Sequence, residues 1–183
     1  MKDNGWNLLG ITSPDCDSGK TLTTINLAIA LSMDMDLSVI IVDCNIRKPS
    51  VGQKFGLDCK GGLIEYLLST EPDFRKYLVK TLLNNLYILP CEKQESIASE
   101  ILTSHKMKEF LHELKSFNSC IVLFDLPSVF IGDDVMAFYG NLDAMMLVIE
   151  DGKTESDKLA RAAQFLERTP LIGSVLNKSK HTY

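Results

Sequence analysis

The chain has 183 residues, of which 19 are Lys or Arg, 24 are Asp or Glu and 45% are hydrophobic. This length predicts a single domain, residues 1–183, which can bury a core without help from disulfides or metals. The net charge of −5 argues against a surface that coats DNA or RNA, because such a surface would be basic. We therefore expect no nucleic-acid partner.

The cysteines and the apolar runs bear on the compartment. The cysteines are odd in number and scattered, without a C-x-x-C pair: Cys16, Cys44, Cys59, Cys91 and Cys120. This pattern indicates reduced thiols rather than a disulfide framework or a zinc site. The N-terminal apolar stretch is too short for a signal peptide, and no run approaches the roughly 20 apolar residues of a membrane-spanning helix. We expect a cytoplasmic protein.

Six continuous apolar runs are typical of strands that are buried on both faces of a sheet. In chain order they are Leu8–Ser13, Ser38–Asp43, Leu86–Leu89, Cys120–Asp125, Ala144–Glu150 and Leu171–Leu176. Apolar residues at three- and four-residue spacing predict the helices Thr21–Met33, Ala98–Phe117 and Thr154–Arg168. The alternation predicts a doubly wound α/β fold, with a mostly parallel sheet and helices on both faces. Ligands of such folds bind beyond the carboxyl ends of the strands, so the residues there are the candidates for a site.

The segment between the first strand and the first helix, residues 13–21, reads SPDCDSGKT. This is the layout of a phosphate-binding loop, in which backbone N–H groups hold phosphate oxygens, the lysine reaches the β- and γ-phosphates and the threonine hydroxyl binds Mg²⁺. Pro14 stands where the strict motif has its first glycine, so the motif is imperfect. Residues 152–154 repeat the triplet Gly-Lys-Thr directly after a strand, without a loop to wrap a phosphate, and we interpret them as a strand-to-helix turn.

Two of the predicted strands end in an aspartate. Asp43, beside a phosphate loop, could hold Mg²⁺ through water or take a proton from a nucleophile, although a solvated turn aspartate is an equally good interpretation of this residue alone. Asp125 follows four apolar residues, which is how P-loop enzymes place a carboxylate that holds the metal. Arg47 and Lys48 face a phosphate, an acidic partner or only solvent. Together, three such elements at separate strand ends indicate one nucleotide site.

In these segments the chain resembles the cytoplasmic kinase domain of bacterial tyrosine kinases of the capsule and exopolysaccharide type, which belong to the P-loop ATPases that include MinD and ParA. The resemblance covers about residues 8–178 and rests on ITS…GKT, INLAIALS, IIVDCNIRKPS, FGL…GGLIEYL, LYILP, SEILTS…M, VLFDLPS and LIGSVLNK. The segments IRKP and SEILTS favour these kinases over the partitioning ATPases. The latter carry a signature lysine where this chain has Asp15.

The resemblance implies ATP and Mg²⁺ as cofactors. The residues that it assigns to nucleotide binding are Asp17, Ser18, Gly19, Lys20, Thr21, Leu22 and Asn177. Those that it assigns to catalysis are Lys20, Asp43 and Asp125, and those that it assigns to Mg²⁺ are Thr21, Asp43 and Asp125. Asn177 would recognise adenine, since an amide offers donors and an acceptor together; the alternative is a cap at the end of a strand.

The chain departs from the family pattern at several positions. Asp17 replaces a loop glycine, and a carboxylate ~6 Å from a phosphate charge costs about 3 kcal/mol at an effective dielectric constant near 20. Either Lys20 and Mg²⁺ offset this repulsion, or the acidic side chains of the loop point away. Asn45 replaces the second aspartate of a D-x-D motif and cannot accept a proton at neutral pH, so any role as a base falls to Asp43. The tyrosine-rich tail is reduced to Tyr183, and the acidic oligomerisation motif near the N-terminus has no clear match.

Three functional hypotheses follow from the resemblance. The first is an ATP-dependent protein tyrosine autokinase of capsule or exopolysaccharide biosynthesis and export, with Tyr183 as the phosphoacceptor that the tail offers. Its expected partners are a membrane-anchored adaptor of the polysaccharide co-polymerase type, on a separate chain at the inner face of the membrane, and further copies in a homo-oligomer. The second is a catalytically weak, nucleotide-dependent regulatory subunit of such a complex. The third is an ATPase like MinD or ParA.

Overall fold

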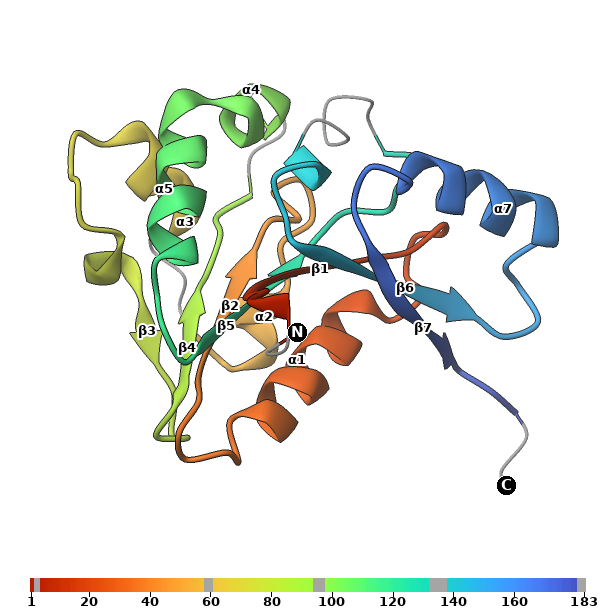
Figure 1. Ribbon diagram of the computed structural model, residues 1–183, viewed down its shortest axis with the longest axis horizontal. Coiled ribbons are helices and arrows are strands. Elements are labelled where there is room, and N and C mark those ends of the chain that lie inside the picture. The colour runs from red at the N-terminus through yellow and green to blue at the C-terminus, as the bar shows by residue number, and fades with distance from the viewer. Residues whose placement is uncertain (2–3, 58–60, 94–97, 132–137, 181–183) are drawn as a thin grey trace.

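The computed structural model describes residues 1, 4–57, 61–93, 98–131 and 138–180, so Cys59 and Tyr183 lie outside the described residues. A seven-stranded sheet in the order β3-β4-β2-β5-β1-β6-β7 forms the centre of the described fold (Figure 1). The strands are β1 Leu8–Thr12, β2 Ser38–Asp43, β3 Val79–Lys80, β4 Leu86–Leu89, β5 Cys120–Asp125, β6 Ala144–Glu150 and β7 Leu171–Asn177. All neighbouring strands are parallel except β3, which runs antiparallel to β4.

The six apolar runs of the sequence are the six parallel strands, and this confirms the mostly parallel sheet. The three central strands β1, β2 and β5 are buried along their length, except for Ser38 at the start of β2. Burial on both faces requires apolar residues at successive positions, and this produces the continuous runs that the sequence shows. β3 has only two residues, which is too short for any periodicity, and the sequence did not predict it.

Helices cover both faces of the sheet, as the doubly wound fold predicts (Figure 1). α1 (Lys20–Leu31) and α2 (Val51–Lys54) pack on one face, in a core that includes Ile25, Ala28 and Val51. The elements on the other face are α3 (Leu63–Leu68), the 3₁₀ helix η2 (Phe74–Tyr77), α4 (Ala98–Thr103), α5 (His105–Lys115) and α7 (Ser156–Phe165). No helix in the described part of the chain has both the length and the apolar character needed to cross a bilayer.

One predicted helix is divided in the structure. The expected helix Ala98–Phe117 is two helices, α4 and α5, which meet at Ser104. Ser104 has an extended backbone, and its Oγ accepts a hydrogen bond of 3.1 Å from the backbone N–H of Met107. This is an N-cap, so α5 begins anew after Ser104 instead of continuing α4. The apolar spacing is similar on both sides of the cap, and for this reason the periodicity did not reveal the break.

The register of the central strands places the candidate site. Asp43 and Asp125 are direct partners at the carboxyl ends of β2 and β5, and Ile11 of β1 pairs with Asp125 on its other side. The loop after β1 therefore starts beside both aspartates. This is the edge of a parallel sheet at which ligands of doubly wound folds bind.

Candidate functional site

Residues 13–19 form a loop between β1 and α1 that is held by its own hydrogen bonds. The hydroxyl groups of Ser13 and Ser18 both donate to the backbone carbonyl of Asp15, the second at 2.9 Å. These bonds curl the chain around one carbonyl group before α1 starts at Lys20. The loop is thus curled before α1, although Pro14 replaces the first glycine of the motif.

Asn177, the last residue of β7, and Lys178 directly after it fasten the same loop. Asn177 Nδ2 donates to the carbonyl oxygen of Ser18 at 2.8 Å, and Lys178 Nζ donates to that of Asp17 at 2.7 Å. Gly19 has a φ of +93°, and a Cβ atom at this position would lie 2.0 Å from Asn177 Nδ2. The amide of Asn177 thus touches the loop itself, and its expected role in adenine recognition stays a prediction.

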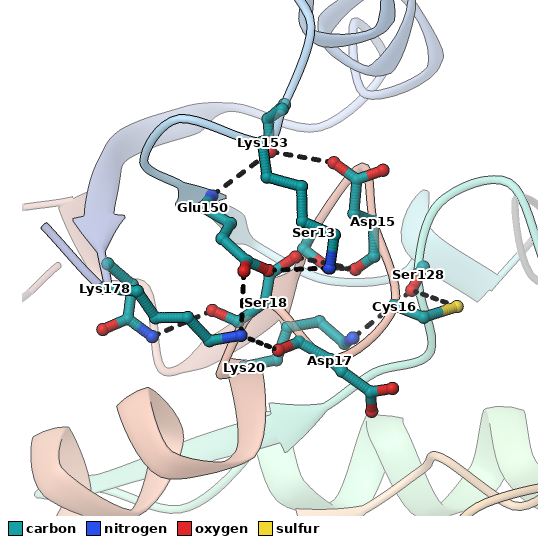
Figure 2. A network of polar contacts seen from close by, with 12 residues as sticks. Ser13, Asp15, Cys16, Asp17, Ser18, Lys20, Ser128, Glu150, Lys153 and Lys178 are labelled. Atoms are coloured by element: carbon teal, nitrogen blue, oxygen red, sulfur yellow. Dashed lines mark hydrogen bonds and ion pairs between the residues drawn. The ribbon is translucent and has the colours of Figure 1, made fainter.

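Lys20 lies at the start of α1 with a buried side chain. Its Nζ donates to the hydroxyl of Ser128 at 3.3 Å (Figure 2). Burial lowers the pKa of Lys20, while the nearby carboxylate of Asp125 opposes this shift. A buried ammonium group with one neutral partner keeps unused donors, which is what a lysine needs in order to bind phosphate oxygens.

Thr21 and Asp125 are joined directly. The hydroxyl of Thr21 donates to Asp125 Oδ2 at 2.6 Å, and the hydroxyl of Ser50 donates to Thr21 Oγ1 at 3.2 Å. The other carboxylate oxygen of Asp125, Oδ1, is buried and has no hydrogen-bond partner among the described residues. Burial, and then the charge of Asp43, raise the pKa of Asp125.

The carboxylate of Asp43 is fully buried and held by backbone N–H groups. Oδ2 accepts from the N–H groups of Ser50 at 2.9 Å and Val51 at 3.0 Å, while Oδ1 accepts from that of Asn45 at 3.2 Å. Burial raises the pKa of Asp43, and these three donors oppose the shift. Asp43 therefore shapes the loop after β2, and an incoming hydroxyl would have to reach a fully buried carboxylate that already uses three of its about four acceptor sites.

These residues fit a hard divalent cation. An unpartnered buried carboxylate oxygen on Asp125, next to the Thr21 hydroxyl, is an oxygen donor set of the kind that Mg²⁺ prefers. No cluster of three His, Cys, Asp or Glu side chains with metal-binding geometry occurs in the described ranges. This is compatible with Mg²⁺, which takes one or two protein ligands and completes its coordination with water and phosphate oxygens.

The side chains of the two loop aspartates point away from each other (Figure 2). Each forms an ion pair with a different lysine. The carboxylate of Asp15 accepts from Thr154 Oγ1 at 2.8 Å and forms an ion pair with Lys158 of α7. That of Asp17 forms an ion pair of 2.9 Å with Lys48. The contact with Thr154 also shows that the second Gly-Lys-Thr triplet is a turn that braces the loop, since its residues have no helix of their own until Ser156.

A hollow of about 360 Å³ opens beside the loop. Its lining is Asp17, Gly19, Lys20, Thr21, Leu22, Asn45, Lys48, Ser50 and Lys54. Five of these residues were assigned to nucleotide binding from the sequence: Asp17, Gly19, Lys20, Thr21 and Leu22. The sequence did not assign Ser50 or Ser128, although both stand in the segments RKPS and DLPS that follow the two aspartates. Nothing in the sequence pattern indicated Lys158.

A scan against protein-family models finds no match. Among curated proteins, the chain is 29% identical to tyrosine-protein kinase YwqD of Bacillus subtilis over 93% of its length and 71% of the relative. It is 26% identical to tyrosine-protein kinase CpsD of Streptococcus pneumoniae, covering 93% of the chain and 75% of the relative. For succinoglycan biosynthesis transport protein ExoP of Rhizobium meliloti, the identity is 28% over 94% of the chain but only 22% of the relative. The chain thus spans less than a quarter of some relatives.

Solved structures share the fold. The kinase domain of VpsO superposes with a TM-score of 0.87 at 23% identity, covering 97% of this chain and 87% of that one. The septum site-determining protein MinD of Pyrococcus horikoshii, solved with Mg-ADP, gives a TM-score of 0.76 at 21% identity, with 95% and 72% covered. The chain is therefore a divergent relative of the bacterial tyrosine-protein kinases, on the P-loop fold that their kinase domains share with MinD.

Proposed function

We propose that the chain binds ATP with Mg²⁺ and acts as a protein tyrosine kinase in capsule or exopolysaccharide biosynthesis. The observation that carries the proposal is the meeting of Lys20, Thr21 and Asp125 at the carboxyl ends of β1 and β5, beside a hollow of about 360 Å³. A buried ammonium, a hydroxyl and an unpartnered carboxylate oxygen are the groups that phosphoryl transfer needs. The similarity to YwqD and CpsD, both described as tyrosine-protein kinases, supports the choice of reaction.

The chain's own residues would divide the work as follows. Lys20 would hold the β- and γ-phosphate oxygens and neutralise charge that develops during transfer. Its burial excludes water from this contact and so strengthens it. Thr21 and Asp125 would hold Mg²⁺, which supplies charge neutralisation and orientation of the phosphates when it is bound.

The removal of the tyrosine proton is the weakest step in this arrangement. Asp43 is the carboxylate assigned to it, but both of its oxygens already accept backbone N–H groups. The side chain that lines the hollow next to it is Asn45, which cannot accept a proton at neutral pH. Transfer would therefore be slow unless a partner or a second copy of the chain contributes a base.

This observation favours a second candidate function, a regulatory subunit that binds nucleotide and has little catalysis. In both cases the partner would be a membrane-anchored adaptor of the polysaccharide co-polymerase type, acting at the inner face of the membrane. The relationship to ExoP, a transport protein of succinoglycan biosynthesis, supports this class of partner. ATP hydrolysis of the MinD kind is the third candidate, and the shared fold is its support.

The test is phosphotyrosine formation from Mg-ATP by the purified chain, alone and with its co-purified membrane partner. The proposal expects label on tyrosine and its loss in Lys20→Ala. Lys153→Ala is the matched control, because Lys153 belongs to the second Gly-Lys-Thr triplet and pairs with Glu150 at 3.1 Å. Nucleotide binding without label in the presence of the partner would select the regulatory function, and absence of nucleotide binding would reject all three.

A further inference from the structure

The ion pair between Asp17 and Lys48 spans two separate segments at the mouth of the candidate nucleotide site. Asp17 belongs to the loop before α1, and Lys48 to the loop between β2 and α2, yet Lys48 Nζ lies 2.9 Å from Asp17 Oδ1. Both residues line the same hollow as Lys20 and Thr21. The pair therefore stands at the place where a polyphosphate would enter.

The pair is built so that it can open. The side chains of Lys48 and Asp17 are 74% and 71% exposed, and ion pairs this exposed contribute little net stability because solvent screens them. Asp17 also has a φ of +58°, a conformation that an aspartate adopts less readily than a glycine. Neither packing nor favourable backbone geometry thus explains an aspartate at this position.

Asp17 has a second cation nearby. Its carboxylate interacts electrostatically with Lys20 and with the more distant Lys153 as well as with Lys48, and the ammonium groups of Lys20 and Lys48 also act on each other. Asp17 thus pairs with Lys48 at the same hollow that the buried, phosphate-assigned Lys20 lines, so its carboxylate is an anion beside the expected phosphate position. A terminal phosphate carries more charge and more acceptor oxygens than a carboxylate, so it would win Lys48 in a direct competition.

We propose that Asp17 is an internal substitute for the terminal phosphate of ATP. Asp17 holds Lys48 at the mouth of the site and releases it to the nucleotide on binding. This inference rests on the proposed nucleotide binding and adds two functions to it. Lys48 becomes a ligand that distinguishes ATP from ADP. It belongs to the loop after Asp43, whereas adenine is expected near Asn177, so Lys48 would contact the terminal phosphate. Asp17 weakens ATP binding, because its carboxylate, once released from Lys48, repels the negatively charged phosphates.

The experiment measures the dissociation constants of Mg-ATP and Mg-ADP by calorimetry for the whole chain and four variants. Asp17→Asn keeps the shape and tolerates the left-handed backbone while removing the charge; it should tighten Mg-ATP binding by about threefold or more. Lys48→Gln should weaken Mg-ATP binding roughly fivefold and Mg-ADP binding less than about twofold. The controls, Glu71→Gln and Lys76→Gln, make the same charge changes in an ion pair away from the hollow, between an exposed lysine and a half-buried glutamate, and should change neither constant.

A double variant makes the competition itself visible. In the wild type, Lys48 must leave Asp17 before it reaches the phosphate, so Lys48→Gln should weaken Mg-ATP binding more in the Asp17→Asn background than in the wild type. Equal effects on ATP and ADP, or changes no larger than those of the controls while the wild type binds ATP, would overturn the inference alone. Absence of ATP binding in the wild type and in Asp17→Asn would overturn the inference and the proposed function together.

Discussion

Gly19 is the residue at which backbone conformation and site geometry depend most directly on each other. Its φ of +93° disfavours any side chain, and a Cβ atom would also meet Asn177 Nδ2 at 2.0 Å. Gly152 has a comparable φ of +71° but nothing within 4 Å of its Cβ position. Gly152→Ala should therefore lower the free energy of unfolding by about 1–2 kcal/mol, the usual cost of left-handed backbone.

Gly19→Ala should lower the free energy of unfolding more than Gly152→Ala, because it adds the collision with Asn177 to the same backbone cost. Urea denaturation of both variants measures the difference, and Gly19→Ala with Asn177→Ala should recover part of it. Equal losses in the two glycine variants would show that the amide of Asn177 yields without cost.

The buried carboxylate of Asp125 should make the protein less stable as the pH rises. Its pKa in the folded chain is raised above the ordinary value of 3.8, mainly by burial. Between these two pKa values the native state binds more protons than the unfolded state, so the free energy of unfolding falls as the pH rises through this window. Asp125→Asn removes the buried charge and should stabilise the metal-free chain at pH 7 by about 1–2 kcal/mol.

Denaturation of the metal-free chain between pH 4 and pH 8 tests this sign. Asp125→Asn should give a flatter profile than the wild type, with the two profiles meeting near pH 4, where the wild-type carboxyl is protonated in the folded state. Asp36→Asn, on an exposed loop, is the control and should leave the profile unchanged. A variant less stable than the wild type at every pH would contradict the cost assigned to this carboxylate.

Asn45 is the residue that limits the proposed kinase reaction. It lines the hollow, while Asp43 is buried behind it with both oxygens engaged. Asn45→Asp places a carboxylate of the same shape on the hollow and should raise the rate of tyrosine phosphorylation by roughly 10²-fold, as a general base does. Lys20→Ala in the same background should abolish the gain, and an unchanged rate would remove proton transfer at this position from the mechanism.

At the scale of elements, the start of α5 depends on one hydroxyl group. Ser104 Oγ accepts from the N–H of Met107, and Phe110 and Leu114 of the same helix are buried in the core. Ser104→Ala should lower the free energy of unfolding by about 1 kcal/mol, while Ser104→Asp should retain the cap. Ser116→Ala, at the exposed end of α5, is the control and should cost less than about 0.5 kcal/mol; equal losses at the two ends would contradict the cap.

The elements that the sequence predicted well are those whose burial requires a pattern. β1, β2 and β5 are covered by helices on both faces, so their apolar runs mark them to within one residue. The division of Ala98–Phe117 escaped prediction because the amphipathic spacing continues across Ser104. The short helices α2 and α3 have four and six residues, and such lengths carry too few turns for periodicity to indicate them.

At the scale of the whole molecule, the parallel sheet converts sequence motifs into one site. Thr21 and Asp125 are 104 residues apart, and Lys20 and Ser128 are 108 apart, yet each pair is hydrogen-bonded because both members follow adjacent strands. Strand ends could therefore be predicted to converge. The partners of Asp43, Asp15 and Asp17 could not be predicted, because they depend on the course of the loops and on where α7 lies against the loop before α1, and periodicity describes neither.

The same convergence predicts how nucleotide should change the stability of the entire chain. The proposed ligand would contact the loop before α1, the end of β5 and the loop after β2, and Asn177 ties the first of these to β7. Unfolding any of these strands would therefore release the ligand. At an ATP concentration 100 times the dissociation constant, binding adds about 2.7 kcal/mol to the free energy of unfolding. For a domain of this size that corresponds to a rise in Tm of roughly 5–10 °C.

Differential scanning calorimetry with Mg-ATP, together with hydrogen exchange, tests this coupling. Protection of backbone amides against hydrogen exchange should rise in β1, β5 and β7 alike, although β7 is the most exposed of the parallel strands. Lys20→Ala should lose both the rise in Tm and the protection, and Lys153→Ala should keep them. Protection confined to the loop before α1 would mean that the ligand orders this loop without joining the strands. An unchanged Tm with ATP and with ADP would show that the site binds neither nucleotide.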